Sequence, residues 1–260
     1  MNRLALLLAA LTLAATGCRS GDTADGRPRP SLLERMTPSM NLSQELIENA
    51  VVIPVANVRT SRNPLTFSPY RVTSLKRGWK RTSEPSFGQI WIGEKSEREP
   101  FSFILQREGE DLWSAECRWA SSSIAGGWSD EDEEIEIESR RAVSLRCLLS
   151  GLAAAESAPW SLELDIDRRP PPGGRTPLSR GRLSSETREL GIEAEFTSAS
   201  AIASYDPTGY LFSDSLGALA AVDVTRAGRM IFSSGLDPED RDLLAAASAA
   251  LALMNEAAFD

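Results

Sequence analysis

Short segments in which every second residue is apolar dominate the middle of the chain. The clearest is WSLELDID (160–167), and the same period of two runs through FSFILQ (101–106), DLWSAECRW (111–119), EIEIE (134–138) and AVSLRCLL (142–149). Such alternation places apolar side chains on one face of a strand and polar side chains on the other. Strands with one buried and one wet face are typical of antiparallel sheets. We therefore predict a mainly β domain, either an antiparallel sandwich or a partly closed barrel.

Further apolar segments extend this prediction toward both ends of the chain. Strand candidates lie at residues 51–58, 190–196, 209–212, 218–224 and 229–232, and a short helix candidate lies at residues 41–50. Between them, RRPPPGGRTPLSRGRLSSE (168–186) is rich in Pro, Gly and Arg. This composition favours a long loop or a boundary between subdomains.

One helix is predicted near the C-terminus, in LDPEDRDLLAAASAALALMNEAAF (236–259). Asp237 can cap its first turn, Pro238 suits the first helical position, and the two acidic residues that follow favour the positive end of the helix dipole. One helical stripe holds Leu243, Ala247, Ala250, Leu251 and Met254. We expect the helix to pack on the sheet through this narrow, alanine-lined face.

The first 18 residues have the layout of an export signal. Arg3 supplies one positive charge, residues 4–15 are apolar, and small residues lead into Cys18. This apolar run is shorter than the roughly 20 residues of a membrane-spanning helix. The sequence ATGC (15–18) resembles the lipobox of bacterial lipoproteins. The resemblance implies removal of residues 1–17 and acylation of Cys18 as a membrane anchor, whereas an ordinary secreted protein is the alternative.

Residues 18–40 are then a lipidated flexible tether, and residues 41–260 are the globular domain. The tether is rich in Gly, Pro, Ser and charge, so it cannot bury enough apolar area to offset its ordering entropy. In lipoproteins of Gram-negative bacteria an aspartate after the acylated cysteine favours the inner membrane, and here the residue is Arg19. We expect an outer-membrane location in the cell envelope, on either face.

Export also affects the expected oxidation state of the other two cysteines. With Cys18 acylated, Cys117 and Cys147 remain, and two thiols in an oxidising compartment are expected to form a disulfide. Both lie on the apolar face of alternating segments. We therefore predict an inward-facing bridge between them, either between adjacent strands or across the core.

Two hairpins are predicted around these cysteines. The first pairs Phe103 with Ala115. The second turns at residues 139–141 and pairs Glu134 with Arg146, because opposite charges across the wet face favour that register.

Composition limits the chemistry that the chain can perform. The 260 residues carry a net charge of −9 and no histidine, so we expect no nucleic-acid binding, and the commonest general base and zinc ligand are missing. The T-x-x-K spacing of Thr73 and Lys76 is of the kind expected by chance. DEDEE (130–134) lacks the ligand spacing of a calcium loop, so a solvated loop is favoured over a calcium site. We predict no catalytic residue, metal site or cofactor.

Charge is unevenly distributed along the chain. Residues 57–83 contain seven basic residues and no acidic one, whereas residues 130–138 contain seven acidic residues and no basic one. Either the basic segment meets lipid phosphates or an acidic partner, or the two segments lie on neighbouring strands and neutralise each other.

These patterns favour an envelope lipoprotein that acts as a non-catalytic accessory or binding module. Its expected partners are the membrane, through the lipid anchor, and an envelope protein, glycan or lipid. Two alternatives remain: a carrier of an apolar ligand or lipid in the concave side of a curved sheet, and an envelope hydrolase with paired carboxylates. A deep apolar cavity would favour the carrier, and two converging carboxylates would favour the hydrolase.

Overall fold

The computed structural model describes residues 50–54, 65–83, 90–129, 134–152, 158–168, 178–196, 206–224 and 228–259. These residues all belong to one compact unit, Thr37–Asp260. Cys18, the tether at residues 18–40, residues 41–49 of the expected short helix and residues 130–133 of the acidic run lie outside the described residues.

Within the described ranges, thirteen strands form one antiparallel sheet. The strands are β1 (Ala50–Pro54), β2 (Thr66–Phe67), β3 (Tyr70–Arg77), β4 (Arg81–Ser83), β5 (Ile90–Arg107), β6 (Glu110–Ser129), β7 (Glu134–Gly151), β8 (Trp160–Asp167), β9 (Leu178–Ser184), β10 (Glu189–Glu195), β11 (Gly209–Ser213), β12 (Ala218–Asp223) and β13 (Arg229–Ser233). From β5 to β13 each strand pairs with the next in sequence, β1 pairs with β13, and β3 and β4 both pair with β5.

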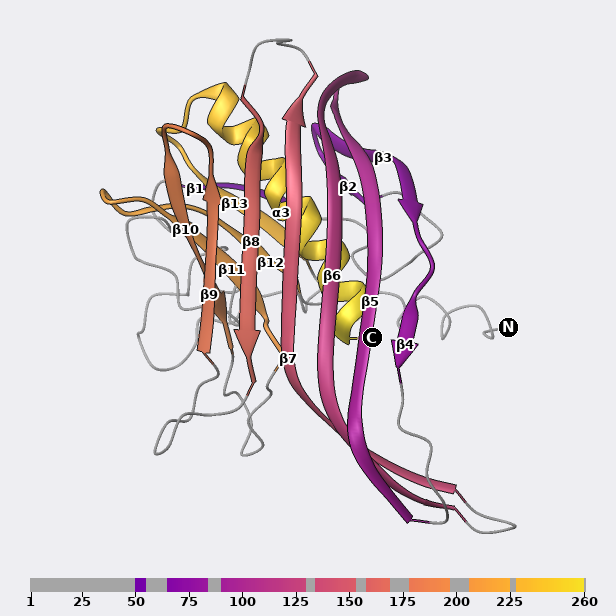
Figure 1. Ribbon diagram of the computed structural model, residues 1–260. Helices are drawn as coiled ribbons and strands as arrows, with labels where there is room; N and C mark the ends of the chain where they lie inside the picture. Colours follow the sequence, from indigo (N-terminus) through magenta and orange to yellow (C-terminus); the bar gives the residue numbers. More distant parts are fainter. Residues whose placement is uncertain are drawn as a thin grey trace, which may run out of the picture. The chain divides into compact units, whose positions relative to one another are not determined.

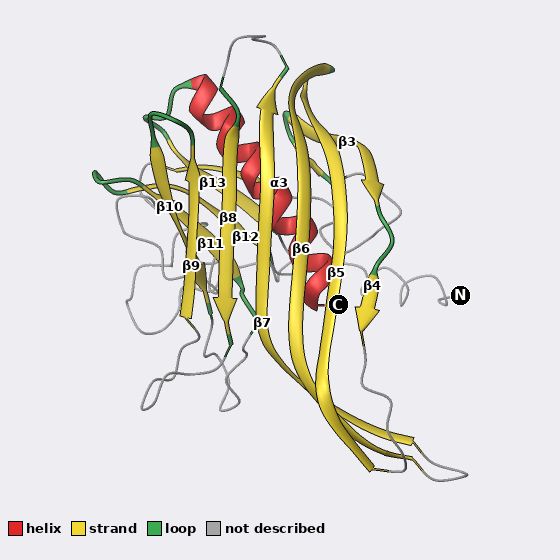
Figure 2. Cartoon of the chain, in the orientation of Figure 1, coloured by secondary structure: helices red, strands yellow, loops and turns green. Residues whose placement is uncertain are grey.

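The sheet curls into a nearly closed barrel around helix α3 (Pro238–Phe259). α3 contacts β6 and β7 at one part of the sheet and β11, β12 and β13 at another. Figures 1 and 2 show the helix running along the inside of the curved sheet. The predicted mainly β class with a C-terminal helix on the sheet is confirmed, and the form is the barrel.

Alternation along the strands decides which side chains face α3. In β8, Leu162, Leu164 and Ile166 are buried, while polar residues alternate with them on the outer face. The largest fully buried side chains on the strands and their connections are Trp119, Tyr210, Phe67, Phe212 and Phe232. Burial of a large apolar side chain contributes about 1.5–3 kcal/mol, so this inner layer supplies most of the stabilising area.

Most predicted strand segments coincide with observed strands, but one prediction fails. The stretch 168–186 was expected to interrupt the sheet, yet its second part forms β9 between β8 and β10. Gly181 of β9 faces inward, where a Cβ atom would lie 2.9 Å from side-chain atoms of both Leu164 and Ile192. Glycine thus lets β9 pack closely between two large residues, so its presence reflects packing and not a loop.

The first predicted hairpin is confirmed. Phe103 pairs with Ala115, and β5 and β6 are joined at Glu108 and Gly109. These two residues have φ angles of 54° and 94°. Two successive positive φ values are typical of the tight turns that match the twist of a hairpin.

The second predicted hairpin is wrong. Residues 139–141 lie inside the continuous strand β7, where Glu134 pairs with Ser129 and Arg146 pairs with Arg118. β6 is 20 residues long and offers a partner to β7 along its whole length. One extra residue of β7 is absorbed by a register shift between Ser122 and Ser123 of β6, so no turn is needed.

The start of α3 agrees with the sequence. The carboxylate of Asp237 accepts a hydrogen bond of 2.8 Å from the backbone N–H of Asp240, as a capping residue does. Asp240 in turn forms an ion pair with Arg188 on the connection between β9 and β10. The hydrogen bond from Arg188 to the Asp240 carboxylate is the main cause of the raised pKa of Arg188.

The expected single packing face of α3 is wrong, because every residue from Asp242 to Asn255 is buried. The helix is therefore buried around its circumference, and among the described strands it contacts β6, β7, β11, β12 and β13. Six of these residues are alanine: Ala245, Ala246, Ala247, Ala249, Ala250 and Ala252. Such small side chains allow strands to approach from every direction. Among the described helices, none is long and apolar enough to span a bilayer.

Polar contacts tie both ends of the buried helix to the sheet. Asp242 accepts a hydrogen bond of 2.7 Å from the hydroxyl of Tyr70 and 2.8 Å contacts from Arg107 to both carboxylate oxygens. Burial, and then the hydrogen bond to Asp242, raises the pKa of Tyr70, so its hydroxyl stays a donor further into the alkaline range. Toward the other end, Arg77 donates to the carbonyl oxygen of Leu253 at 3.5 Å.

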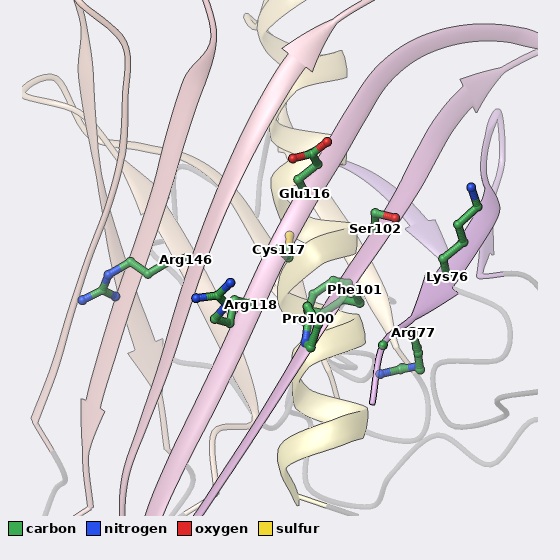
Figure 3. A pocket seen from close by; sticks show the side chains of 10 residues that line it. Lys76, Arg77, Pro100, Phe101, Ser102, Glu116, Cys117, Arg118 and Arg146 are labelled. Atoms are coloured by element: carbon green, nitrogen blue, oxygen red, sulfur yellow. The ribbon is translucent and has the colours of Figure 1, made fainter. Parts of the chain in front are cut away.

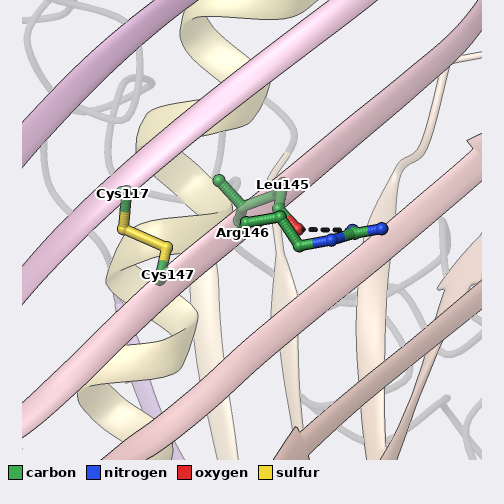
Figure 4. The surroundings of a disulfide bond; sticks show 4 residues. All are labelled: Cys117, Leu145, Arg146 and Cys147. Atoms are coloured by element: carbon green, nitrogen blue, oxygen red, sulfur yellow. Dashed lines mark hydrogen bonds between the residues drawn. A yellow bond between two sulfur atoms is a disulfide. The ribbon is translucent and has the colours of Figure 1, made fainter.

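The predicted disulfide is present between adjacent strands. Cys117 of β6 pairs directly with Cys147 of β7, and their Cα atoms are 4.1 Å apart. Both side chains are buried on the inner face. Figure 4 shows the bridge beside Arg146, the residue that precedes Cys147.

Strands β5, β6 and β7 extend beyond their neighbours as a three-stranded arm, seen at the bottom of Figure 1. β4 pairs with β5 only from Ser96 to Arg98, and β8 pairs with β7 only from Ala142 onward. Beyond these positions no described strand covers the two outer edges of the arm. Ile92 in this part of β5 is 77% exposed.

Reducing the bridge between Cys117 and Cys147 is expected to lower the free energy of unfolding by about 3–4 kcal/mol, because it closes a loop of 30 residues. Urea denaturation with and without reductant measures the change. The double variant Cys117→Ala with Cys147→Ala is the control and should be insensitive to reductant. Two thiols titrating in the denatured, unreduced protein would contradict the bridge.

Candidate anion-binding surface

An open hollow of about 640 Å³ lies where β3, β5, β6 and β7 run side by side. Its lining residues are Lys76, Arg77, Gly78, Pro100, Phe101, Ser102, Glu116, Cys117, Arg118 and Arg146. Lys76, Glu116, Arg118 and Arg146 are exposed residues of the outer face. Figure 3 shows Glu116 and Ser102 in front of the sheet and α3 behind it. The hollow therefore opens to solvent and not to the interior.

The charge of this hollow is opposite to that of the whole chain. Four of its lining residues are basic and one, Glu116, is acidic, whereas the chain carries a net charge of −9. Arg77 and Arg146 are paired with Glu99 and Asp165. Lys76 and Arg118 against Glu116 therefore leave a small excess of positive charge, which attracts anions to that position. The positions of these charged residues follow from the strand register.

Two arginines of the hollow lie directly opposite each other. Arg118 of β6 pairs with Arg146 of β7. Like charges at directly opposed positions destabilise a sheet by roughly 0.2–1 kcal/mol. The adjacent pair in the same register is Cys117 with Cys147, which the disulfide joins. A covalent bond therefore holds the register that brings the two arginines together.

Arg146 turns away from Arg118 and toward β8. Its guanidinium donates to Asp165 at 2.7 Å and to the carbonyl oxygens of Leu145 and Leu164 at 2.9 and 3.0 Å. The bond to Leu145 is drawn in Figure 4. Arg118 has no hydrogen bond or ion pair with any residue in the described part of the chain. Its charge is thus available to a ligand.

A second like-charge pair lies next to the first. Arg81 of β4 pairs directly with Arg98 of β5, and both are exposed. Arg98 is two residues before Pro100, which pairs with Arg118, so Arg98 and Arg118 are diagonal neighbours about 7 Å apart. Neither Arg81 nor Arg98 forms an ion pair inside the described ranges. We call Lys76, Arg81, Arg98 and Arg118 the basic cluster.

Opposite charges neutralise each other on the neighbouring strands of the outer face. Arg182 of β9 pairs with Glu163 of β8 at 2.9 Å, and Arg146 pairs with Asp165 at 2.7 Å. Surface pairs of this kind contribute at most about 1 kcal/mol each. These two pairs neutralise Arg146 and Arg182, in contrast to the basic cluster.

The expected neutralisation between the basic and acidic segments is wrong, because β5 and β6 lie between β7 and the strands that carry the basic residues. Two of those residues are neutralised by β5 instead: Arg77 by Glu99 at 3.3 Å and Lys80 by Glu97 at 3.1 Å. Three others remain exposed, namely Arg71, Lys76 and Arg81. Arg59 and Arg62 lie outside the described residues.

Sequence reasoning found the contribution of β3 and β4 to this surface but missed Arg98, Arg118 and Arg146. All three occupy the polar positions of alternating strands, which indicates only that they face water. Of the T-x-x-K residues, Lys76 lines the hollow, and the Thr73 hydroxyl donates to the carbonyl oxygen of Ile104 at 3.4 Å. The strand register was the missing information.

One carboxylate of the described chain has a raised pKa. Burial, and then the charge of Glu193, raises the pKa of Glu195. Glu195 lies on β10, four strands from β6 in the sheet order, and does not line the hollow. The hollow and this carboxylate are therefore separate features.

No family model, no curated protein and no solved structure matches this chain. Its function is therefore inferred from the geometry of the outer face.

Arg118→Gln is expected to leave the stability of the fold unchanged or to raise it by less than about 1 kcal/mol, because Arg118 has no partner in the described chain while Arg146, which lies opposite, is already paired with Asp165. Urea denaturation at low and at high salt measures the effect, which should shrink as salt screens the charges. Arg182→Gln is the matched control on the same face and should be neutral or slightly destabilising, since it breaks the pair with Glu163. A destabilised Arg118→Gln protein would mean that Arg118 supports the fold.

Proposed function

We propose that the protein is a lipid-anchored, non-catalytic binding module of the cell envelope, and that its domain binds an anionic group through the basic cluster. The observation that supports this proposal is the direct opposition of Arg118 and Arg146 in a chain of negative net charge. Stability alone favours an acidic residue at one of these two positions. Asp165 compensates Arg146, so the arginine at position 118 is explained if a ligand supplies the negative charge that it lacks.

The groups around the hollow suit phosphate or carboxylate. A guanidinium presents a planar set of donors that matches the oxygens of either group, and an ammonium supplies a compact charge. Arg118 provides the guanidinium, Lys76 provides the ammonium, and Ser102 adds a hydroxyl at the same hollow. Because the hollow is open, it suits anionic groups displayed on a polymer or a surface better than a small molecule that needs enclosure.

The inside of the sheet supports the binding module over the carrier. α3 occupies the concave side, and its residues from Asp242 to Asn255 are all buried. An apolar ligand bound at that place would have to displace the helix and break its contacts with Tyr70 and Arg107. A ligand that binds to the outer face of the sheet leaves α3 in place.

We expect the domain to bind inorganic polyphosphate in a salt-dependent manner, measured by isothermal titration calorimetry. Arg118→Gln should weaken binding about tenfold, the value of one charge-assisted hydrogen bond, and should flatten the dependence of affinity on salt. Arg182→Gln, the control on the same face, should leave affinity unchanged. Equal affinities of wild type and Arg118→Gln would overturn the proposed site.

The anchor requires a separate test. Cys18→Ser is expected to abolish incorporation of radiolabelled palmitate and to release the processed or unprocessed protein from outer-membrane fractions. Cys117→Ala with Cys147→Ala is the control and should remain labelled. A wild-type protein without acyl mass would contradict the lipid anchor while leaving the anion site untouched.

A further inference from the structure

Trp79 is the most exposed aromatic residue among those whose side chains the structure describes. Its side chain is 89% exposed, whereas Trp113 and Trp119 are buried. Trp79 lies on the short connection between β3 and β4. A single exposed apolar residue is common on protein surfaces, so the surroundings of Trp79 must decide whether it has a role.

The connection that carries Trp79 is held closely against the sheet. The backbone N–H of Gly78 donates to the carbonyl oxygen of Pro100 at 2.7 Å. A Cβ atom at Gly78 would lie only 2.5 Å from Cγ of Pro100, so only glycine allows this approach. Gly78 and Pro100 both line the hollow. Trp79 is therefore fixed at the rim of the hollow.

Arg77, two residues before Trp79, and Lys80, directly after it, have side chains that contact β5. Arg77 pairs with Glu99, and Lys80 pairs with Glu97 and lies 5.8 Å from the ring of Trp119. Both flanking side chains are thus engaged with the protein. The indole of Trp79 alone projects into solvent from a connection that is fixed on both sides.

The basic cluster lies on β3, β4, β5 and β6, next to the connection that carries this indole. Arg81 follows Trp79 by two residues and opposes Arg98, and Arg98 is the diagonal neighbour of Arg118. The exposed carboxylates on this face of β5 and β6 near the cluster are Glu94 and Glu116. Four exposed cations and two exposed carboxylates therefore lie on the strands next to the connection that carries one exposed tryptophan.

This combination matches the chemistry of a membrane interface. Tryptophan prefers the layer between lipid headgroups and acyl chains. Each arginine or lysine near an anionic membrane adds about 1 kcal/mol of attraction, about fivefold in affinity. An open sheet face can lie against an extended surface, and Ile92, which is 77% exposed on β5, adds apolar area at the arm.

We propose that this face docks on an anionic phospholipid bilayer, with Trp79 entering the interfacial layer and the basic cluster binding lipid phosphates. This inference rests on the proposed anion-binding function and names its ligand. A soluble phosphorylated polymer shares the phosphate chemistry but offers no apolar layer for the indole.

The test uses the full chain with vesicles that contain brominated lipid, which quenches tryptophan fluorescence only at close range. The fluorescence of wild type minus that of Trp79→Phe isolates the contribution of Trp79, whatever else attaches the chain to the vesicle. With about a third of phosphatidylglycerol in the vesicles, we expect at least half of this contribution to be quenched. With phosphatidylcholine alone, we expect none.

Two sets of variants make the test specific. Arg98→Gln and Arg118→Gln should each raise the lipid concentration that gives half-maximal quenching about fivefold. The matched control is Trp79→Phe combined with Leu216→Trp, because Leu216 is 93% exposed but lies beside Asp214 at another turn. A tryptophan at position 216 should remain unquenched.

The possible outcomes separate the two proposals. Quenching that requires phosphatidylglycerol and the arginines supports docking on the membrane. Binding of polyphosphate without quenching in either vesicle overturns the membrane inference and leaves the anion site standing. Absence of polyphosphate binding together with absence of quenching overturns both the membrane inference and the proposed anion site. Equal quenching in neutral and anionic vesicles also overturns the inference, because lipid charge then has no part in docking.

Discussion

Burial of α3 on all sides is the constraint on which the rest of this structure depends. A helix that is apolar around its whole circumference must be enclosed by other elements. In the described part of the chain the surrounding element is one nearly closed sheet, whose two edges are β1 and β2. The strands supply the largest buried side chains and the helix supplies six alanines, so the helix and the inner face of the sheet can pack closely.

Enclosure also explains the polar contacts of the helix. The carboxylate of Asp242 is buried, and an unpaired buried carboxylate is strongly destabilising. Tyr70 and Arg107 satisfy it from β3 and β5. These strands are near the edge of the sheet that ends in β2, so the same contact that stabilises the charge holds that edge against the helix.

The sequence predicted the parts of the fold that depend on local pattern. Alternation identified β8, and Asp237 identified the start of α3, because each signal lies within a few residues. The enclosure of α3 was not predictable in this way, since Ala245 and its neighbours suit a narrow face as well as a complete one. The continuity of β7 was also missed, because it depends on the length of β6.

Prediction of the candidate site from the sequence has the same limit. The seven basic residues between 57 and 83 were visible in the sequence, but the sequence did not show that Arg77 and Lys80 turn inward to meet β5. Arg118 and Arg146 became notable only when the register placed them opposite each other. Pairing between strands is a property of the whole sheet, and it determines which charges find partners.

The order of the strands along the chain has a consequence for how the protein folds. β1 pairs with β13, which lies about 180 residues later, and α3 follows every strand in the sequence. During synthesis the strands emerge before the helix that they enclose, so they have no interior to bury until α3 is available. Contacts between such distant segments slow folding. The hairpins of the meander can form early, whereas closure of the sheet must wait for the last strand and the helix.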